Sequence, residues 1–456
     1  MKLENNLGKD DIKTLVFRLA IPSMMAQFVS VLYSIVDRMY IGNIPQVGEL
    51  ALAGVGICGP IVTLISSFAS LVGIGGAPYM SIRMGEKKED LARQILANCF
   101  LMLSILSVVL TIVFLLLKSR LLLWFGASQV TFPYANAYMT IYVAGTAFAI
   151  LSLGMNQFII CQGFSLTGMK SVILGAVINI ILDPIFIFVF HMGVQGAALA
   201  TVISQMASCA YVLHFLFGDK PPVRITFGNY SWPVCRRVLQ LGFSPFFIIA
   251  FDNILIITMN TVLQKYGGPG EGDMLVTCAT VIQSFMLIVT MPLSGISGGT
   301  QPVVAFNFGA RDRKRVLKGQ RETVKLALLF TTLMFIAANT ISVYFVRIFT
   351  KNPEYINLCV WGIRVYTLGV IPLGAQYTIV DGFIAMGEAK LAMFLSFFRK
   401  FLYFGCVFLL PVIWGARATF YTEPIVDFVG PALSICLYLL CIRKILDRRM
   451  NGAVSS

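Results

Sequence analysis

The 456-residue chain is strongly apolar, with 57% hydrophobic and only 12% charged residues. Ordinary soluble domains carry about 25% charged residues, so this composition excludes a soluble globular fold and indicates an integral protein of the lipid bilayer. The net charge of +14 does not point to nucleic acid, because the basic residues form neither a single patch nor an RNA-binding motif. We therefore expect a multi-pass protein of the plasma (inner) membrane without a nucleic-acid partner.

The cysteine and histidine pattern argues against a disulfide framework or a zinc site. The ten cysteines are scattered singly, mostly within apolar runs, and no CxxC pair occurs. The two histidines, His191 and His214, lie far apart near predicted helix ends. We expect reduced structural thiols. The sequence also lacks a nucleotide-binding loop, so we expect neither an enzyme nor direct use of ATP.

Twelve apolar runs have the length of a membrane-spanning helix, which needs about 20 predominantly apolar residues. The sequence therefore predicts an all-α membrane protein with twelve transmembrane helices. The predicted spans are 15–41, 50–82, 94–117, 130–160, 169–191, 194–217, 237–263, 274–305, 323–346, 355–385, 390–414 and 418–442.

The loop charges predict the orientation of these spans. An even number of spans puts both termini on one side of the membrane, and most of the 35 lysine and arginine residues fall in segments on that side. Short loops rich in Lys and Arg stay in the cytoplasm. We therefore predict cytoplasmic N and C termini.

The two halves of the chain resemble each other. GGAPYMSIRMGEKKED after the second span pairs with GTQPVVAFNFGARDRK after the eighth, which aligns Pro78 with Pro302. NQFIICQGFSLTGMK in turn pairs with AQYTIVDGFIAMGEAK. Because the matched helices have the same number within each half, the halves run in the same direction, and their pseudo-two-fold axis lies along the membrane normal. We predict a six-helix lobe over 1–217, a cytoplasmic linker over 218–236 and a second six-helix lobe over 237–456.

Polar side chains of the first lobe converge at one depth in the membrane. Counting about 1.5 Å per helical residue places Asp37 about 8 Å, Asp183 about 13 Å and Thr201 about 10 Å below the outer surface. Asn179 precedes Asp183 by four residues and so shares its helix face. These oxygens suit a hard cation, or a proton shared between two carboxylates that cannot both stay charged at close range. We predict a cation-coupling site at Asp37, Asn179, Asp183 and Thr201.

Two prolines allow the helices of this site to bend. Pro22 interrupts the first span and Pro184 follows Asp183 directly. Each removes a backbone hydrogen bond and permits a kink. We predict a helix-1 kink at Pro22.

A purely structural role for these polar residues is the alternative. Asp37 can pair with Arg38 at a helix end, although adjacent helical residues do not face a common partner. The amide of Asn179 and the hydroxyl of Thr201 can also join helices by hydrogen bonds.

The second lobe carries a different set of charges. Asp252 interrupts the seventh span, Arg399 enters the eleventh, and Glu423 and Asp427 share one face of the twelfth. One interpretation is a counter-charge network that joins Arg399 to Glu423 or Asp427. The other is substrate contact, in which a buried carboxylate selects a cationic compound. Counting residues along the tenth span places Asp381 near its cytoplasmic end, and we interpret Asp381 as a polar cap of that helix.

Several stretches resemble the multidrug and toxic compound extrusion (MATE) family over nearly the whole chain. They are LAIPSMM, VDRMYIGNI, INIILDPIF, GVQGAALATVISQ and MPLSGISGGTQPVVAFNFGARDRKRV. The resemblance implies a two-lobe exporter that opens alternately to each side and exchanges sodium ions or protons for amphiphilic, usually cationic compounds. It implies no other cofactor.

The resemblance also implies roles for individual residues. The family's cation site in the first lobe uses an aspartate of helix 1, an Asn and an Asp four apart in helix 5, and a threonine of helix 6. These match Asp37, Asn179, Asp183 and Thr201. A subgroup relies on an acid in helix 7, which maps to Asp252, but Ser244 stands where that subgroup has proline and its helix-10 acid has no clear counterpart.

Other classes of membrane protein fit less well. A lipid-linked oligosaccharide flippase of the same superfamily is the main alternative, but it is expected to line its cavity with several cationic residues. The segment MGEKKEDLARQ lacks the pattern of major facilitator transporters, and no pore loop or ligand domain of a channel or receptor occurs. We expect a monomer whose partners are small organic, mainly cationic substrates and the lipid bilayer.

Overall fold

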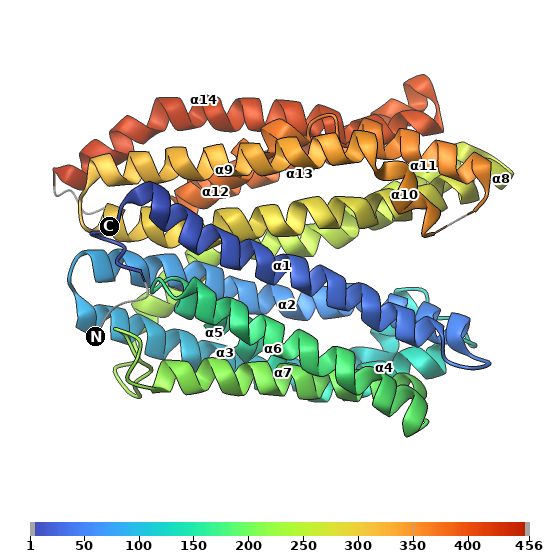
Figure 1. Cartoon of the computed structure of the whole chain (residues 1–456), viewed down its shortest axis with the longest axis horizontal. Helices are drawn as coiled ribbons and strands as arrows, with labels where there is room; N and C mark the ends of the chain where they lie inside the picture. The colour runs from blue at the N-terminus through green and yellow to red at the C-terminus, as the bar shows by residue number, and fades with distance from the viewer. Residues whose placement is uncertain (1–4, 350, 452–456) are drawn as a thin grey trace. The chain divides into compact units, whose positions relative to one another are not determined.

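Helices account for all the regular structure in residues 5–349 and 351–451, which the computed structural model describes. This confirms the predicted all-α fold (Figure 1). The first helices are α1 (Ile12–Gly42), α2 (Gly48–Gly85), α3 (Glu89–Trp124), α4 (Phe132–Ala144), α5 (Thr146–Ile160), α6 (Ser165–Pro184) and α7 (Gly193–Phe217). The others are α8 (Trp232–Gly309), α9 (Arg313–Thr340), α10 (Ser342–Arg347), α11 (Pro353–Tyr366), α12 (Val370–Ala385), α13 (Ala389–Trp414) and α14 (Thr422–Met450).

The number of membrane spans agrees with the sequence when bent helices are counted as pairs. Within the described residues, 10 helical segments are long and apolar enough to cross a bilayer, or up to 12 if each bent pair is one span. The pairs are α4 with α5, bent by 57°, and α11 with α12, bent by 48°. α8 supplies two spans, Trp232–Gly268 and Met274–Gly309.

Several helices extend beyond their predicted limits. α3 covers Glu89–Trp124 where the sequence predicts 94–117, and α9 begins at Arg313 rather than near 323. Hydropathy marks only the part of a helix that suits lipid, whereas backbone hydrogen bonding continues into polar surroundings. The Asp312 side chain, which accepts a hydrogen bond from the Arg315 amide, fixes the earlier start of α9.

The chain divides into two compact units that exchange parts of two helices. Unit 1 comprises the described residues up to Lys9 and Met25–Ala250, and unit 2 comprises Asp10–Met24 and the described residues from Phe251. The beginning of α1 therefore belongs to unit 2, and the beginning of α8 belongs to unit 1. The prediction of lobes over 1–217 and 237–456 concerns the repeat and stays a prediction, but the packing units do not follow those limits.

Small residues explain how the exchanged segments pack. In unit 1, a Cβ atom on Gly242 of α8 would lie 1.7 Å from the Leu71 carbonyl oxygen of α2. In unit 2, a Cβ atom on Gly299 would lie 2.4 Å from Ser23 Oγ, and one on Gly295 would lie 2.6 Å from the Ser23 carbonyl oxygen. Glycine at these positions lets the helix backbones approach closely, as is common between membrane helices. Pro22, next to Ser23, lies inside α1, which continues without a break in its helical assignment.

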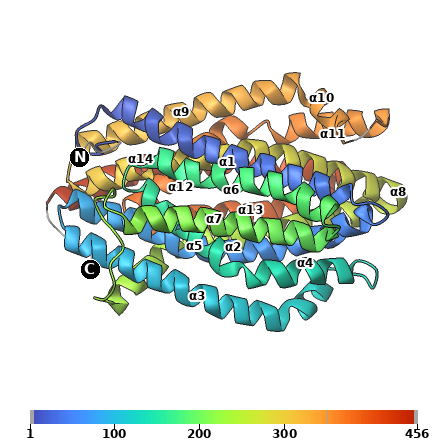
Figure 2. The same cartoon turned by 60° about the horizontal axis from the view of Figure 1, so that its bottom comes forward.

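Each bent pair turns at a glycine that packs against another helix of its own unit. In unit 1, a Cβ atom on Gly145 would lie 2.5 Å from Val202 Cγ2 of α7. In unit 2, one on Gly369 would lie 2.5 Å from Asp427 Cβ of α14. α7 also runs alongside α6 in both views (Figures 1 and 2). The bends thus place α4 and α11 beside helices that carry polar residues.

The bend of unit 1 can be tested by filling the space at Gly145. We expect Gly145→Ala to lower the free energy of unfolding by about 1–3 kcal/mol, the usual cost of overpacking, and to lower Tm in detergent. Gly56→Ala is the matched control, because nothing lies within 4 Å of the added Cβ atom. Its Tm should be unchanged or slightly raised. Val202→Ala should recover part of the loss in the double variant, and strictly additive losses would contradict the contact.

Candidate functional site

Four helices of unit 1 bring polar side chains together as pairs spaced four residues apart. The helices are α1, α4, α6 and α7, and in each helix the paired residues lie on one face. The pairs are Tyr33 and Asp37, Tyr138 and Tyr142, Asn179 and Asp183, and Thr201 and Gln205. We call this group the unit 1 cluster.

The centre of the unit 1 cluster is a contact between two acids. The side chains of Asp37 and Asp183 contact each other directly. Asp183 is fully buried, with 0% exposure, and its Oδ1 accepts a hydrogen bond of 3.2 Å from Asn179 Nδ2. Asp37 Oδ1, Asp183 Oδ2 and Asn179 Oδ1 are buried without a hydrogen-bond partner in the described part of the chain. Three acceptor oxygens therefore lie around one acidic pair with no donor.

This arrangement calls for a positive charge. Ionised carboxylates only accept hydrogen bonds, so two of them cannot satisfy each other. Burial of an unpaired charge is costly in an apolar environment, and a second like charge at contact distance adds repulsion. A proton between Asp37 and Asp183, or a cation bound by their oxygens, removes both costs. The contact therefore provides the oxygens that a shared proton or a bound cation would use.

Thr201 lies at the edge of this cluster. Its hydroxyl donates to the Ala197 carbonyl oxygen at 3.0 Å, and its side chain interacts with Tyr138. Tyr138 also lies within electrostatic range of Asp37. The structure thus brings three of the predicted residues, Asp37, Asn179 and Asp183, into one group and connects Thr201 to them through an aromatic hydroxyl.

The sequence analysis did not single out the tyrosines or Gln205. Tyr33 interacts electrostatically with Asp37 and Asp183, and Tyr142 interacts with Gln205. Their spacing was the available signal, because Tyr33 precedes Asp37 by four residues and Gln205 follows Thr201 by four. A polar residue one helical turn from a predicted site residue is therefore the pattern that indicates these positions.

The two prolines have different structural effects. Pro184 is the last residue of α6, and a π-helical turn, Ile185–Val189, follows it. π-helical turns are rare and often occur at functional sites. The backbone therefore changes its hydrogen-bond pattern immediately after Asp183. Pro22, in contrast, belongs to the part of α1 that packs in unit 2, whereas Asp37 belongs to unit 1.

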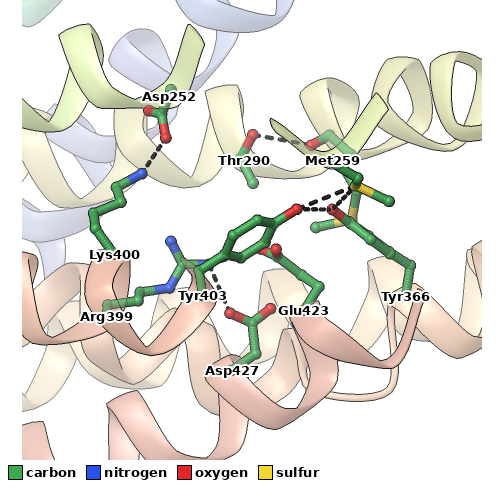
Figure 3. Close-up of polar contacts among 10 residues, drawn as sticks. Asp252, Met259, Thr290, Tyr366, Arg399, Lys400, Tyr403, Glu423 and Asp427 are labelled. Atoms are coloured by element: carbon green, nitrogen blue, oxygen red, sulfur yellow. Dashed lines mark hydrogen bonds and ion pairs between the residues drawn. The ribbon is translucent and has the colours of Figure 1, made fainter. Parts of the chain in front are cut away.

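Unit 2 contains an ion-pair group in which one arginine contacts two acids (Figure 3). Arg399 Nη2 of α13 lies 2.7 Å from Glu423 Oε1 and 2.7 Å from Asp427 Oδ1 of α14. The Asp427 side chain is 0% exposed. The sequence left the choice between Glu423 and Asp427 open, and the structure pairs Arg399 with both.

The neighbouring residues extend this group. Lys400 forms an ion pair with Asp252 of α8, which is half exposed (Figure 3). The hydroxyls of Tyr366 and Tyr403 lie 3.2 Å apart, and Tyr403 Oη lies 3.2 Å from Met259 Sδ. We call these residues, together with Arg399, Glu423 and Asp427, the unit 2 cluster. It combines three acids and two bases with a polarizable thioether and two phenols.

Asp381 has a partner that the sequence did not predict. The Ser297 hydroxyl of α8 donates a hydrogen bond to Asp381 Oδ2 of α12. The interpretation of Asp381 as a simple polar cap is therefore incomplete, since its carboxylate connects two helices of unit 2.

Comparison with known proteins adds the family. The MatE family model matches residues 22–185 and 249–408. The multidrug export protein MepA of Staphylococcus haemolyticus (strain JCSC1435) is 22% identical over 440 residues, which cover 94% of each chain. A structure described as the outward-facing conformation of a multidrug resistance MATE family transporter of the MOP superfamily has a TM-score of 0.89 and 21% identity, and the match covers 96% of this chain and 98% of that one.

A second solved structure gives the same fold. It is a MOP superfamily transporter from Pyrococcus furiosus, whose description says that the reverse polarity of its binding pocket suggests a different function. It has a TM-score of 0.89 and 21% identity, again with coverage of 96% and 98%. Both structural matches show the fold alone, whereas the family model covers most of the chain, although its matched ranges leave out α7 and α14. The chain therefore belongs to the MatE family of membrane transporters.

Proposed function

We propose that this chain is a secondary active multidrug exporter that exchanges Na+ or H+ for amphiphilic, mainly cationic compounds by alternating access. The observation that carries this proposal is the direct contact of Asp37 with Asp183 in unit 1, surrounded by unsatisfied oxygens. Such a pair needs one positive charge to offset the repulsion between its carboxylates. The names of the relatives, which are called multidrug export proteins, support the choice of cargo.

The coupling step follows from the electrostatics of the unit 1 cluster. A proton or Na+ that arrives from outside neutralises the repulsion between Asp37 and Asp183 and changes the packing of α1 against α6. Pro22 gives α1 a position without a backbone hydrogen bond, where it can bend. Coupling then requires only that the ion binds one conformation better than the other and that the drug has the opposite preference.

The energetics decide which gradient can drive export. Moving a compound against a hundredfold gradient costs about 2.7 kcal/mol. One charge that moves down about 100 mV yields about 2.3 kcal/mol. If one monovalent cation enters for each monovalent drug that leaves, the electrical contributions cancel. The chemical gradient of the ion must then supply the energy.

The unit 2 cluster has a different role in this proposal. Arg399 supplies from within the chain one positive charge for the two acids Glu423 and Asp427, so this cluster depends less on an external ion than the unit 1 cluster does. We propose that it holds α13 and α14 together and leaves its phenols and thioether to contact apolar cargo.

The same pairing disfavours a flippase for lipid-linked oligosaccharides. A pyrophosphate group needs unpaired cationic side chains. Arg399 and Lys400 both have acidic partners within unit 2. The charge of the unit 2 cluster is therefore better suited to neutral or cationic compounds than to pyrophosphate.

Removal of either acid of unit 1 should uncouple export. We expect Asp37→Asn and Asp183→Asn to reduce ion-driven efflux of ethidium from proteoliposomes to the rate of empty vesicles, because an amide needs no cation. Both proteins should keep the wild-type Tm. Asp90→Asn is the control, since the Asp90 side chain is 99% exposed, and should transport normally. Wild-type efflux rates in the two site variants would contradict this function.

Independent gradients identify the ion. In vesicles in which pH and sodium are set separately, we expect one of the two gradients to accelerate ethidium movement in the wild type and neither to do so in Asp183→Asn. The reason is that the same oxygens accept a proton or bind Na+. Transport that responds to neither gradient in the wild type would rule out antiport at this site.

The structural role of Arg399 predicts a rescue. Arg399→Met leaves two buried acids without their cation and should lower the free energy of unfolding by about 3–5 kcal/mol. Further substitution of Glu423→Gln and Asp427→Asn should restore most of the Tm. A single variant that keeps its Tm but loses drug affinity would instead favour direct substrate contact.

A further inference from the structure

Two cysteine side chains of unit 2 lie in direct contact. Cys278 of α8 and Cys359 of α11 are separated by 81 residues in sequence, and their sulfur atoms are 2.9 Å apart. Cys278 is 0% exposed and Cys359 is 1% exposed. Cys359 donates its thiol hydrogen to Cys278 Sγ, and the other contact of Cys278 is a weak one of 3.9 Å to the Tyr355 carbonyl oxygen. Neither thiol therefore has a strong competing partner among these contacts.

Both cysteines lie near the same end of unit 2. Cys278 follows the start of its span at Met274 by four residues, about 6 Å along the helix, and Cys359 follows Pro353 by six residues, about 9 Å. Within unit 2, this end carries the α10–α11 turn and lies away from the C-terminal end of α14 (Figure 1). In the orientation predicted from loop charges, it faces the outside.

The helix packing next to the cysteines is close. One turn further along each helix, Gly362 of α11 meets Ile282 of α8, and a Cβ atom on Gly362 would lie 2.4 Å from Ile282 Cδ1. The absence of a side chain at Gly362 lets the two helices approach. A disulfide needs Cβ atoms about 3.5–4.5 Å apart and sulfurs about 2.05 Å apart. The two sulfur atoms have to approach by less than 1 Å to reach the length of a disulfide bond.

We propose that Cys278 and Cys359 are a modification site at which an intrachain disulfide links α8 to α11. The oxidant is a low-molecular-weight disulfide. The thiolate of one cysteine attacks it, a small thiol leaves, and a mixed disulfide forms. The second cysteine, as thiolate, then attacks the protein sulfur of this mixed disulfide and displaces the second small thiol. Both cysteine protons pass to the released thiolates or to water, and the oxidant is reduced to two thiols.

The bond would stabilise unit 2 without acting on unit 1. Both cysteines belong to unit 2, and the bond closes a long loop of the unfolded chain, which favours the folded state. This inference is independent of the coupling site, since neither cysteine belongs to the unit 1 or unit 2 cluster.

The test uses reduced full-length protein in detergent with 4,4′-dithiodipyridine. We expect the pair to lose its two thiols and release two thiopyridones without keeping an adduct, whereas a single cysteine such as exposed Cys436 keeps a mixed-disulfide adduct. Digestion without reductant should give one cross-linked peptide pair that contains Cys278 and Cys359. The oxidised protein should have a higher Tm, which dithiothreitol lowers again.

Serine variants provide the controls. Cys278→Ser and Cys359→Ser should each abolish both the cross-linked peptide and the rise in Tm, whereas Cys209→Ser, at a buried single cysteine of unit 1, should change neither. The proposal is overturned if Cys278 and Cys359 stay free after Cys436 has reacted completely. It is equally overturned if they carry separate adducts, or if the cross-link persists in Cys278→Ser.

Discussion

Two carboxylates that touch inside an apolar helical bundle are the constraint on which the structure of unit 1 depends. Asp37 and Asp183 come from helices far apart in sequence, and burial leaves an oxygen of each without a donor. Such a contact is stable only with a proton or cation present. The surrounding tyrosines and amides provide polar groups at the right depth, and the π-helical turn after Pro184 interrupts the regular backbone beside them. In the proposed mechanism, ion occupancy and helix packing are therefore linked at this cluster.

In unit 2, a basic side chain of the protein itself provides a positive charge next to two acids. Its acids Glu423 and Asp427 are four residues apart on one helix, and Arg399 contacts both. A cation attached to the chain cannot leave, so Arg399 offsets one of the two acidic charges at all times. The two units thus share a type of framework, a bent pair that packs at a glycine against a helix near polar residues. They differ in whether a basic side chain of the protein contacts the acids, as Arg399 does in unit 2. This difference explains why we assign ion coupling to unit 1.

Much of this arrangement could be predicted from the sequence, because the depth of a residue in the membrane can be counted along its helix. Asp37, Asn179 and Asp183 were grouped by depth and lie together, and Arg399 was expected near Glu423 or Asp427. Tyr33 and Gln205 were missed because neither side chain carries a charge and neither lies next to a charged residue in sequence. The contact of Cys278 with Cys359 depends on which helices pack, and a spacing of 81 residues does not reveal it. Helix ends were misplaced where helices continue past the apolar run.

The exchange of helix segments between the units has a consequence for the synthesis of the chain. Unit 1 is complete only after the ribosome has made Ala250, and unit 2 needs Asp10–Met24 from the very beginning. Neither half of the sequence therefore supplies all the residues of one packing unit. The segment Asp10–Met24 is made first, and the rest of unit 2 follows only after Ala250.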